Sequence, residues 1–164
     1  MHKLSNMSKQ QMDEIKIILT DIDDTITTDG SLKSSSYSAL ERLSDAGYIV
    51  IPVTGRCAGW CDHIARMWPV NGVVGENGAF FFSYNHQSNK MLHTYSQSEK
   101  ERTNNKKTLQ TIKKIVLDTI PGSALASDQD YRKTDLAIDF AEDVPRLSTS
   151  NIKEIVNIAI KAGA

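Results

Sequence analysis

The chain has 164 residues, of which 40% are hydrophobic and 24% are charged, and its formal net charge is −1. This length suits one compact domain, or one domain with part of another. The near-neutral charge gives no reason to expect nucleic acid or an anionic membrane as a partner, and no apolar stretch approaches the roughly 18–20 residues that a membrane span requires. We therefore expect a soluble, cytoplasmic protein.

Residues 1–14 are polar and lack the apolar middle of a signal peptide, so we expect a disordered arm there. The apolar run 15–20 then predicts a buried strand, and the sequence Asp21-Ile22-Asp23-Asp24-Thr25 follows it directly. Open α/β sheets bind their ligands at the carboxyl edge of the strands. Two carboxylates one residue apart at that edge suit a nucleophile, an acid/base group and a divalent cation.

An acidic cluster of this kind also occurs without any catalytic role. Acids in a loop are often only a helix cap or a solvated turn. A calcium-binding loop is excluded because Ile26 stands where such a loop requires glycine, and no glutamate stands at its twelfth position.

The next elements alternate between helix and strand, which is typical of a parallel sheet with right-handed crossovers. The fold class that we predict is therefore α/β. The expected elements are a helix over 34–46 ended by Gly47, a strand over 48–53, a helix with Trp60, Ile64 and Met67 on one face, and a strand over 70–75.

Further candidate site residues follow the second and third of these strands. Thr54, Gly55 and Arg56 come after the second strand, where the threonine hydroxyl can donate to a phosphoryl oxygen beside Asp21. Asn77 follows the third strand and either contacts a substrate or serves only a tight Asn-Gly turn. Arg56 either meets a phosphate or pairs with an acid of the core.

The second half of the chain has a different pattern. We expect a hairpin over 79–95, a long helix over 98–119, strands over 124–127 and 134–140, and a last helix from Thr149. The predicted inward residues are Leu109, Ile112, Val116 and Ile120 of the long helix, Leu136, Ile138 and Phe140 of the last strand, and Ile152, Ile155, Val156 and Ala159 of the last helix.

Two remaining groups of residues are weaker candidates for a site. Cys57 and Cys61 are spaced like half of a metal site, but no second pair of soft ligands follows, so we expect two reduced cysteines. The polar segment 128–135 is either an exposed hairpin loop or a substrate-binding segment in which Arg132 or Lys133 contacts the substrate.

The Asp-x-Asp-x-Thr pattern after an apolar strand resembles the nucleophile motif of the haloacid dehalogenase-like hydrolases. Val53-Thr54-Gly55-Arg56 is similar to the second motif in the sugar-phosphatase and phosphomannomutase branch of that superfamily, and Asn77-Gly78-Ala79 is similar to a turn of the same branch. The resemblance implies a Rossmann-like core over 15–82 and an α+β cap over 83–164.

The resemblance also implies an activity, namely Mg²⁺-dependent hydrolysis of a phosphate monoester, such as a sugar phosphate or a similar small metabolite. Asp21 would accept the phosphoryl group, Asp23 would act as acid and then base, and Thr54, Gly55, Arg56 and Asn77 would bind the substrate. The carboxylate of Asp21 and the backbone carbonyl of Asp23 would bind Mg²⁺.

Two later motifs of the family, a lysine and an acidic pair, have no counterpart after Glu142. We therefore expect the core to be partial and the cap incomplete, with the chain ending inside its cap. An incomplete sheet exposes a strand edge, so self-association is expected. The alternative functions are a phosphosugar mutase on the same scaffold, or a catalytically inactive fragment that acts as an interaction protein.

Overall fold

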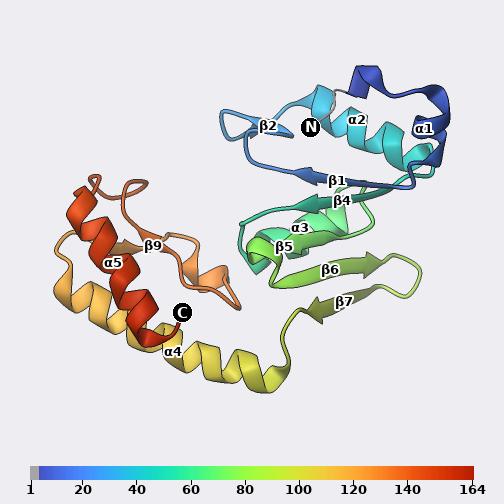
Figure 1. Ribbon diagram of the computed structural model, residues 1–164. Coiled ribbons are helices and arrows are strands. Elements are labelled where there is room, and N and C mark those ends of the chain that lie inside the picture. The colour runs from blue at the N-terminus through green and yellow to red at the C-terminus, as the bar shows by residue number, and fades with distance from the viewer. Residues whose placement is uncertain (1–3) are drawn as a thin grey trace. The chain divides into compact units, whose positions relative to one another are not determined.

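The computed structural model describes residues 4–164, and the chain divides into two compact units (Figure 1). The first unit holds the residues through 56 together with 61–94, and the second holds 57–60 together with 95–164. No helix in the described part of the chain combines the length and the apolar character needed to cross a membrane.

The N-terminal segment is helical over part of its length. A short turn of 3-10 helix, η1, covers Leu4–Asn6, and helix α1 covers Lys9–Glu14. The Ser8 hydroxyl accepts a hydrogen bond from the Gln11 amide, and the Gln11 side chain accepts one from the Ser8 amide. This capping box accounts for a helix in a segment for which the sequence predicts disorder. Residues 1–3 of that predicted arm lie outside the described residues.

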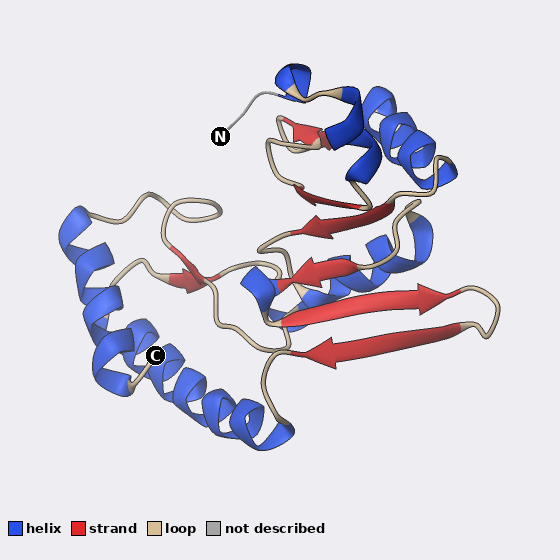
Figure 2. Cartoon of the chain, turned by 45° about the vertical axis from the view of Figure 1, so that its right-hand side comes forward, coloured by secondary structure: helices blue, strands red, loops and turns tan. Residues whose placement is uncertain are grey.

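The first unit is built on a five-stranded sheet with the order β1-β4-β5-β6-β7 (Figure 2). Strands β1, β4 and β5 are parallel, and β6 runs antiparallel to β5. The strands cover Ile17–Asp21 (β1), Ile49–Val53 (β4), Val73–Gly75 (β5), Phe80–Asn85 (β6) and Lys90–Tyr95 (β7). A small two-stranded hairpin, β2 (Thr27–Thr28) with β3 (Ser31–Leu32), follows β1. The predicted α/β architecture is confirmed.

The two helices of this sheet are α2 (Ser34–Asp45) and α3 (Ala58–Met67). Helix α2 packs on β4, and it ends at the expected glycine, since Gly47 adopts φ +85°. Helix α3 approaches the sheet closely, because a Cβ on Gly75 of β5 would lie 2.6 Å from Sγ of Cys61.

The buried face of α3 differs from the predicted one. Trp60 and Met67 are 54% and 63% exposed, so only Ile64 of the predicted face is buried. The buried residues of this region are instead Cys57, Ala58, Cys61, Ile64 and Ala65. These positions also recur at helical spacing, and the small side chain of Cys61 allows the close approach to Gly75 of β5. Both cysteines are thiols rather than halves of a disulfide, as expected.

One face of the sheet is apolar and exposed, and we call it the open face. It carries Ile17, Leu19 and Ile49, which are 54%, 66% and 40% exposed. Strand β1 was predicted to be buried, but it is an edge strand, and no other strand within residues 4–164 pairs with its outer side. The sheet therefore exposes an apolar edge strand, β1, as expected from the sequence.

The boundary between the units follows the hairpin of β6 and β7. The core was predicted to end at Phe82, which lies within β6. The structure keeps the whole hairpin in the first unit, since β6 pairs with β5 through Phe80 and Phe82. The rings of these two residues stack with centroids 4.1 Å apart and fill the core.

The second unit packs helix α4 (Glu99–Thr119) against helix α5 (Thr149–Ala162). Its other elements are β8 (Ala124–Leu125), β9 (Ile138–Asp139) and the 3-10 helix η3 (Gln129–Tyr131). The buried residues Ile112, Val116, Ile120 and Ile158 form its core, with Leu109, Leu136, Ile138, Leu147 and Ile155 packed around them. The predicted apolar side of α4 is thus confirmed.

Three predictions for this unit are wrong. Val156 of α5 is 51% exposed, and Ile158 is buried in its place. Phe140, which was expected to point inward, is 41% exposed. The strand expected over 134–140 is reduced to Ile138–Asp139. The Gln129 side chain supplies the reason, because its amide donates to the Asp135 carbonyl and accepts from the Ala137 amide. These backbone groups therefore need no partner strand.

Candidate active site

Strand β1 ends at Asp21, and a tight turn follows. The carbonyl of the buried Ile22 accepts hydrogen bonds from the amides of Thr25, Ile26 and Thr27, at 3.3, 3.0 and 3.0 Å. The Asp21 carboxylate stays exposed and accepts a hydrogen bond of 3.1 Å from the Thr25 hydroxyl. The turn thus fixes one carboxylate at the carboxyl edge of the sheet, with its oxygens accessible to a ligand.

The second acid of the motif, Asp23, is held by Arg56. Nη2 of Arg56 donates to Oδ1 of Asp23 at 2.7 Å, and Nε donates to the same carboxylate at 3.1 and 3.3 Å. About two fifths of each side chain is exposed. Of the two alternatives for Arg56, the structure shows the pairing with an acid, and that acid is a site residue rather than a core residue.

Thr54 follows β4 and is buried at 3% exposure. Its hydroxyl accepts a hydrogen bond of 3.0 Å from the Arg56 amide and lies 3.5 Å from Oδ2 of Asp23. The hydroxyl was expected beside Asp21, but its described carboxylate contact is Asp23. Thr54 therefore joins the strand end to the Asp23–Arg56 ion pair.

The turn after β5 lies against the residues after β4. The Asn77 amide donates to the Thr54 carbonyl at 3.2 Å, and the Glu76 amide donates to the Arg56 carbonyl at 3.1 Å. A Cβ on Gly55 would lie 3.0 Å from Oδ1 of Asn77, so the glycine leaves room for the asparagine amide. Asn77 has φ +56°, which asparagine tolerates better than most residues.

All six predicted site residues are thus gathered at the carboxyl edge of β1, β4 and β5. This arrangement follows from the parallel order of the strands, because their carboxyl ends meet at one edge. The arrangement presents an exposed carboxylate, an ion pair, a buried hydroxyl and the amide side chain of Asn77. Such a set can hold a phosphate ester next to a nucleophile.

Glu76 is not among the predicted site residues, yet it lies at the same edge and is 3% exposed. A buried carboxylate is costly unless it is hydrogen-bonded or paired, so burial of this residue marks it as part of the site's framework. The sequence could have identified Glu76 as a site residue from its position. It directly follows an apolar strand, and Asp21 lies at the end of another one.

The donors for a metal ion are few. Within residues 4–164, no three His, Cys, Asp or Glu side chains are arranged to hold one. Of the two acids predicted to bind the metal, Asp23 has its carboxylate engaged by Arg56, which leaves the exposed carboxylate of Asp21 together with backbone carbonyls. This set fits Mg²⁺ bound through one carboxylate and completed by water and a phosphate, and it does not fit a closed protein cage.

Comparison with known proteins places this geometry in a family. The family model of the haloacid dehalogenase-like hydrolases matches residues 18–160. The chain belongs to this family. No curated protein matches its sequence significantly.

Solved structures support the fold of this haloacid dehalogenase-like chain. The crystal structure of protein 0175 of Thermoplasma acidophilum matches it with a TM-score of 0.64 and 14% identity, over 91% of this chain and 58% of that one. Plasmodium falciparum IMP-nucleotidase matches with a TM-score of 0.52 and 14% identity, over 92% of this chain and 42% of that one. The chain therefore spans about half the length of these structures.

Proposed function

We propose that this chain carries the phosphoryl-accepting half of a phosphate-monoester hydrolase that acts on a small phosphorylated metabolite, such as a sugar phosphate, in the cytoplasm. The observation that supports the proposal most is the exposed Asp21 carboxylate, fixed at the sheet edge next to the Asp23–Arg56 pair. Family membership supports the same class of chemistry.

The proposed reaction has two steps. An oxygen of Asp21 attacks phosphorus, the bond from phosphorus to the leaving oxygen breaks, and Asp23 gives that oxygen a proton. Asp23 then takes a proton from water, which attacks phosphorus and releases inorganic phosphate from Asp21. In the structure Arg56 holds the Asp23 carboxylate. We infer that Arg56 turns toward the incoming phosphate, which frees Asp23 for the proton transfers.

Mg²⁺ belongs to this proposal as a cofactor. It would be held by the Asp21 carboxylate and the Asp23 carbonyl, and when bound it would shield the phosphate charge from the attacking carboxylate. Thr54 donates its hydroxyl to a phosphoryl oxygen, and Asn77 presents its side-chain amide over Gly55.

The test compares two variants of the 164-residue chain. Asp21→Asn removes the nucleophile with little change of shape, so whatever turnover of phosphate esters the parent shows with Mg²⁺ should fall to background. The matched control is Asp24→Asn, because Asp24 is exposed and has φ +56°, which asparagine adopts readily. It should retain turnover within about threefold of the parent.

Mass spectrometry of acid-quenched protein adds a second measurement. A covalent phosphate should be found on the peptide that contains Asp21 in the parent and in Asp24→Asn. If Asp21→Asn kept the turnover of the parent, or if the phosphate were found on another residue, the assignment of the nucleophile would be wrong.

A further inference from the structure

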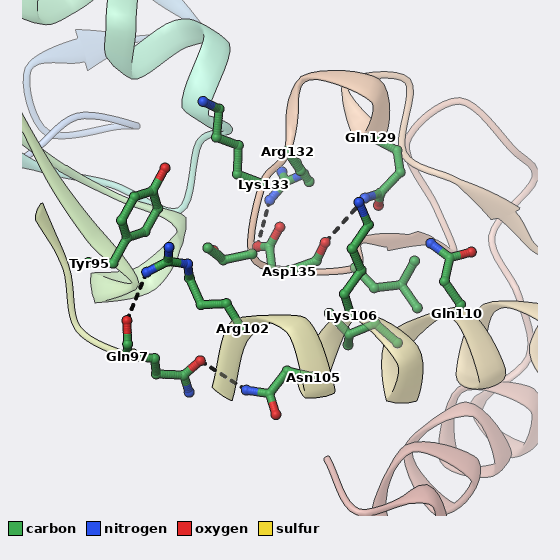
Figure 3. Close-up of a pocket in the computed structure, with 13 residues that line it drawn as sticks. Tyr95, Gln97, Arg102, Asn105, Lys106, Gln110, Gln129, Arg132, Lys133 and Asp135 are labelled. Atoms are coloured by element: carbon green, nitrogen blue, oxygen red, sulfur yellow. Dashed lines mark hydrogen bonds and ion pairs between the residues drawn. The ribbon is translucent and has the colours of Figure 1, made fainter. Parts of the chain in front are cut away.

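The second unit contains a cavity of about 330 Å³. One wall is a face of α4, and the other is the segment that runs from η3 toward β9 (Figure 3). The lining residues that matter here are Arg102, Asn105, Lys106, Gln110, Arg132 and Thr134. None of them belongs to the proposed active site, so the cavity is a separate feature of the fold.

The wall opposite α4 is held in place by Arg132. Nε and Nη2 of Arg132 donate to the two oxygens of Asp128 at 2.8 and 2.9 Å, and Nη1 donates to Asp135 at 2.8 Å. Burial alone would lower the pKa of the Arg132 guanidinium, but its hydrogen bonds to Asp128 and Asp135 outweigh this and raise the pKa. Two carboxylates thus more than balance the single positive charge of Arg132, which holds the segment in place rather than offering its charge to a ligand.

The cations on the α4 wall are not neutralised in this way. Arg102 and Lys106 lie one helical turn apart, where like charges repel. The Arg102 guanidinium donates to the Gln97 carbonyl at 2.8 Å and lies 3.8 Å from the centroid of the Tyr95 ring. Among the described residues, neither Arg102 nor Lys106 forms an ion pair with a carboxylate. This wall therefore presents two positive charges to the cavity.

The rest of the lining is suited to hydroxyl groups. Asn105, Gln110 and Thr134 supply neutral donors and acceptors, and Leu109 and Leu136 supply apolar surface. The volume lies near the lower end of the ~300–1,000 Å³ found for small-molecule sites. A small polar molecule therefore fits the cavity better than a peptide or a large apolar ligand does.

We propose that this cavity binds a small hydroxylated anion, a sugar acid or a sugar phosphate, whose acidic group lies between Arg102 and Lys106. An arginine with a fixed guanidinium and a flexible lysine together form charge-assisted hydrogen bonds to carboxylate or phosphate oxygens. The side chain of Lys133 extends away from Arg102 in Figure 3, and the proposal does not need it. The inference is independent of the phosphatase proposal, because it concerns binding within the second unit.

The experiment measures binding to the 164-residue chain by calorimetry and by amide chemical shifts. Gluconate represents the sugar acids, glucose 6-phosphate the sugar phosphates, and glucose the neutral sugars. The expected result is binding of at least one anion, with shifts among residues 97–110 and 129–136. Arg102→Gln and Lys106→Gln should each weaken this binding about tenfold or more. Lys114→Gln, an exposed site on α4 outside the cavity, should change it less than twofold.

The two anions distinguish the source of the charge, since gluconate alone would identify a carboxylate site and glucose 6-phosphate alone a phosphate site. Several results would overturn the proposal: glucose binding as tightly as the anions, Lys114→Gln weakening binding as much as Lys106→Gln, or no binding of either anion at about 10 mM. Shifts confined to residues 21–25 and 54–56 would also count against it. That last outcome would leave the phosphatase proposal intact, and loss of turnover in Asp21→Asn tests that proposal separately.

Discussion

At the scale of single residues, the Asp23–Arg56 ion pair is the contact that most changes the interpretation of the site. The strand pattern predicts both residues at one sheet edge but does not show that they bind each other, since the contact depends on the turn after β1. The position of each site residue follows from the order of the strands, which the pattern of apolar runs predicts. The side chain that each residue contacts depends on side-chain rotamers, which that pattern does not predict.

A prediction about Mg²⁺ follows from this pair. Because Arg56 engages the Asp23 carboxylate, Asp21 is the one predicted ligand whose carboxylate stays accessible, and Mg²⁺ binding in the absence of phosphate should be weak, with a Kd of about 1 mM or higher. Calorimetric titration with MgCl₂ measures it, and Asp21→Asn should remove what binding there is. Micromolar affinity would mean that other ligands complete the site.

At the scale of elements, the second unit depends on a loop that is closed by Asp139. The amides of Glu142 and Ala141 donate to this carboxylate, and the amide of Asp143 does so as well, at 2.8–2.9 Å. These hydrogen bonds favour the charged form and lower the pKa of Asp139.

Asp139→Asn should therefore destabilise the chain at neutral pH. A carboxyl group whose pKa is lower in the folded state stabilises it above the unfolded pKa of about 3.9, and this contribution is lost as the pH falls through the folded pKa. Urea denaturation at pH 7 and at pH 3 measures the effect, and the difference between parent and variant should shrink at the lower pH. A difference that is independent of pH would assign the effect to packing.

Element boundaries were predicted more accurately than buried faces. Helix α2 ends where Gly47 was expected to cap it, because a residue with positive φ gives a local signal. The faces of α3 and α5 were misjudged because large apolar residues were assumed to be inward. Trp60 and Val156 are exposed, and smaller or neighbouring residues at equally good helical spacing take their places. Only the tertiary structure decides between two such faces.

At the scale of the whole molecule, the open face of the first unit is an uncovered apolar surface on an unpaired edge strand. Exposed apolar patches and free strand edges favour association. The chain should therefore associate with itself, in line with the expectation from its sequence, in a concentration-dependent way that sedimentation velocity can measure.

Leu19→Lys tests which surface is responsible for this association. Leu19 is 66% exposed, so lysine is accommodated without loss of core packing, and its charge should shift the equilibrium toward monomer about tenfold or more. Met67→Lys is the matched control, because Met67 is 63% exposed on α3, which packs on the opposite face of the sheet. Equal effects of the two substitutions would exclude the open face as the contact.

The edge position of β1 also determines how fast its amide protons exchange with solvent. The Ile49 amide donates to the Lys16 carbonyl, so alternate backbone groups from Lys16 onward point to β4 and the groups between them point outward. In monomeric protein, the amide hydrogens of Ile17 and Leu19 should therefore exchange with deuterium much faster than that of Ile18. If association adds a strand at this edge, the alternation should disappear as the protein concentration rises. The isotope pattern along three residues would then report whether the sheet has been extended.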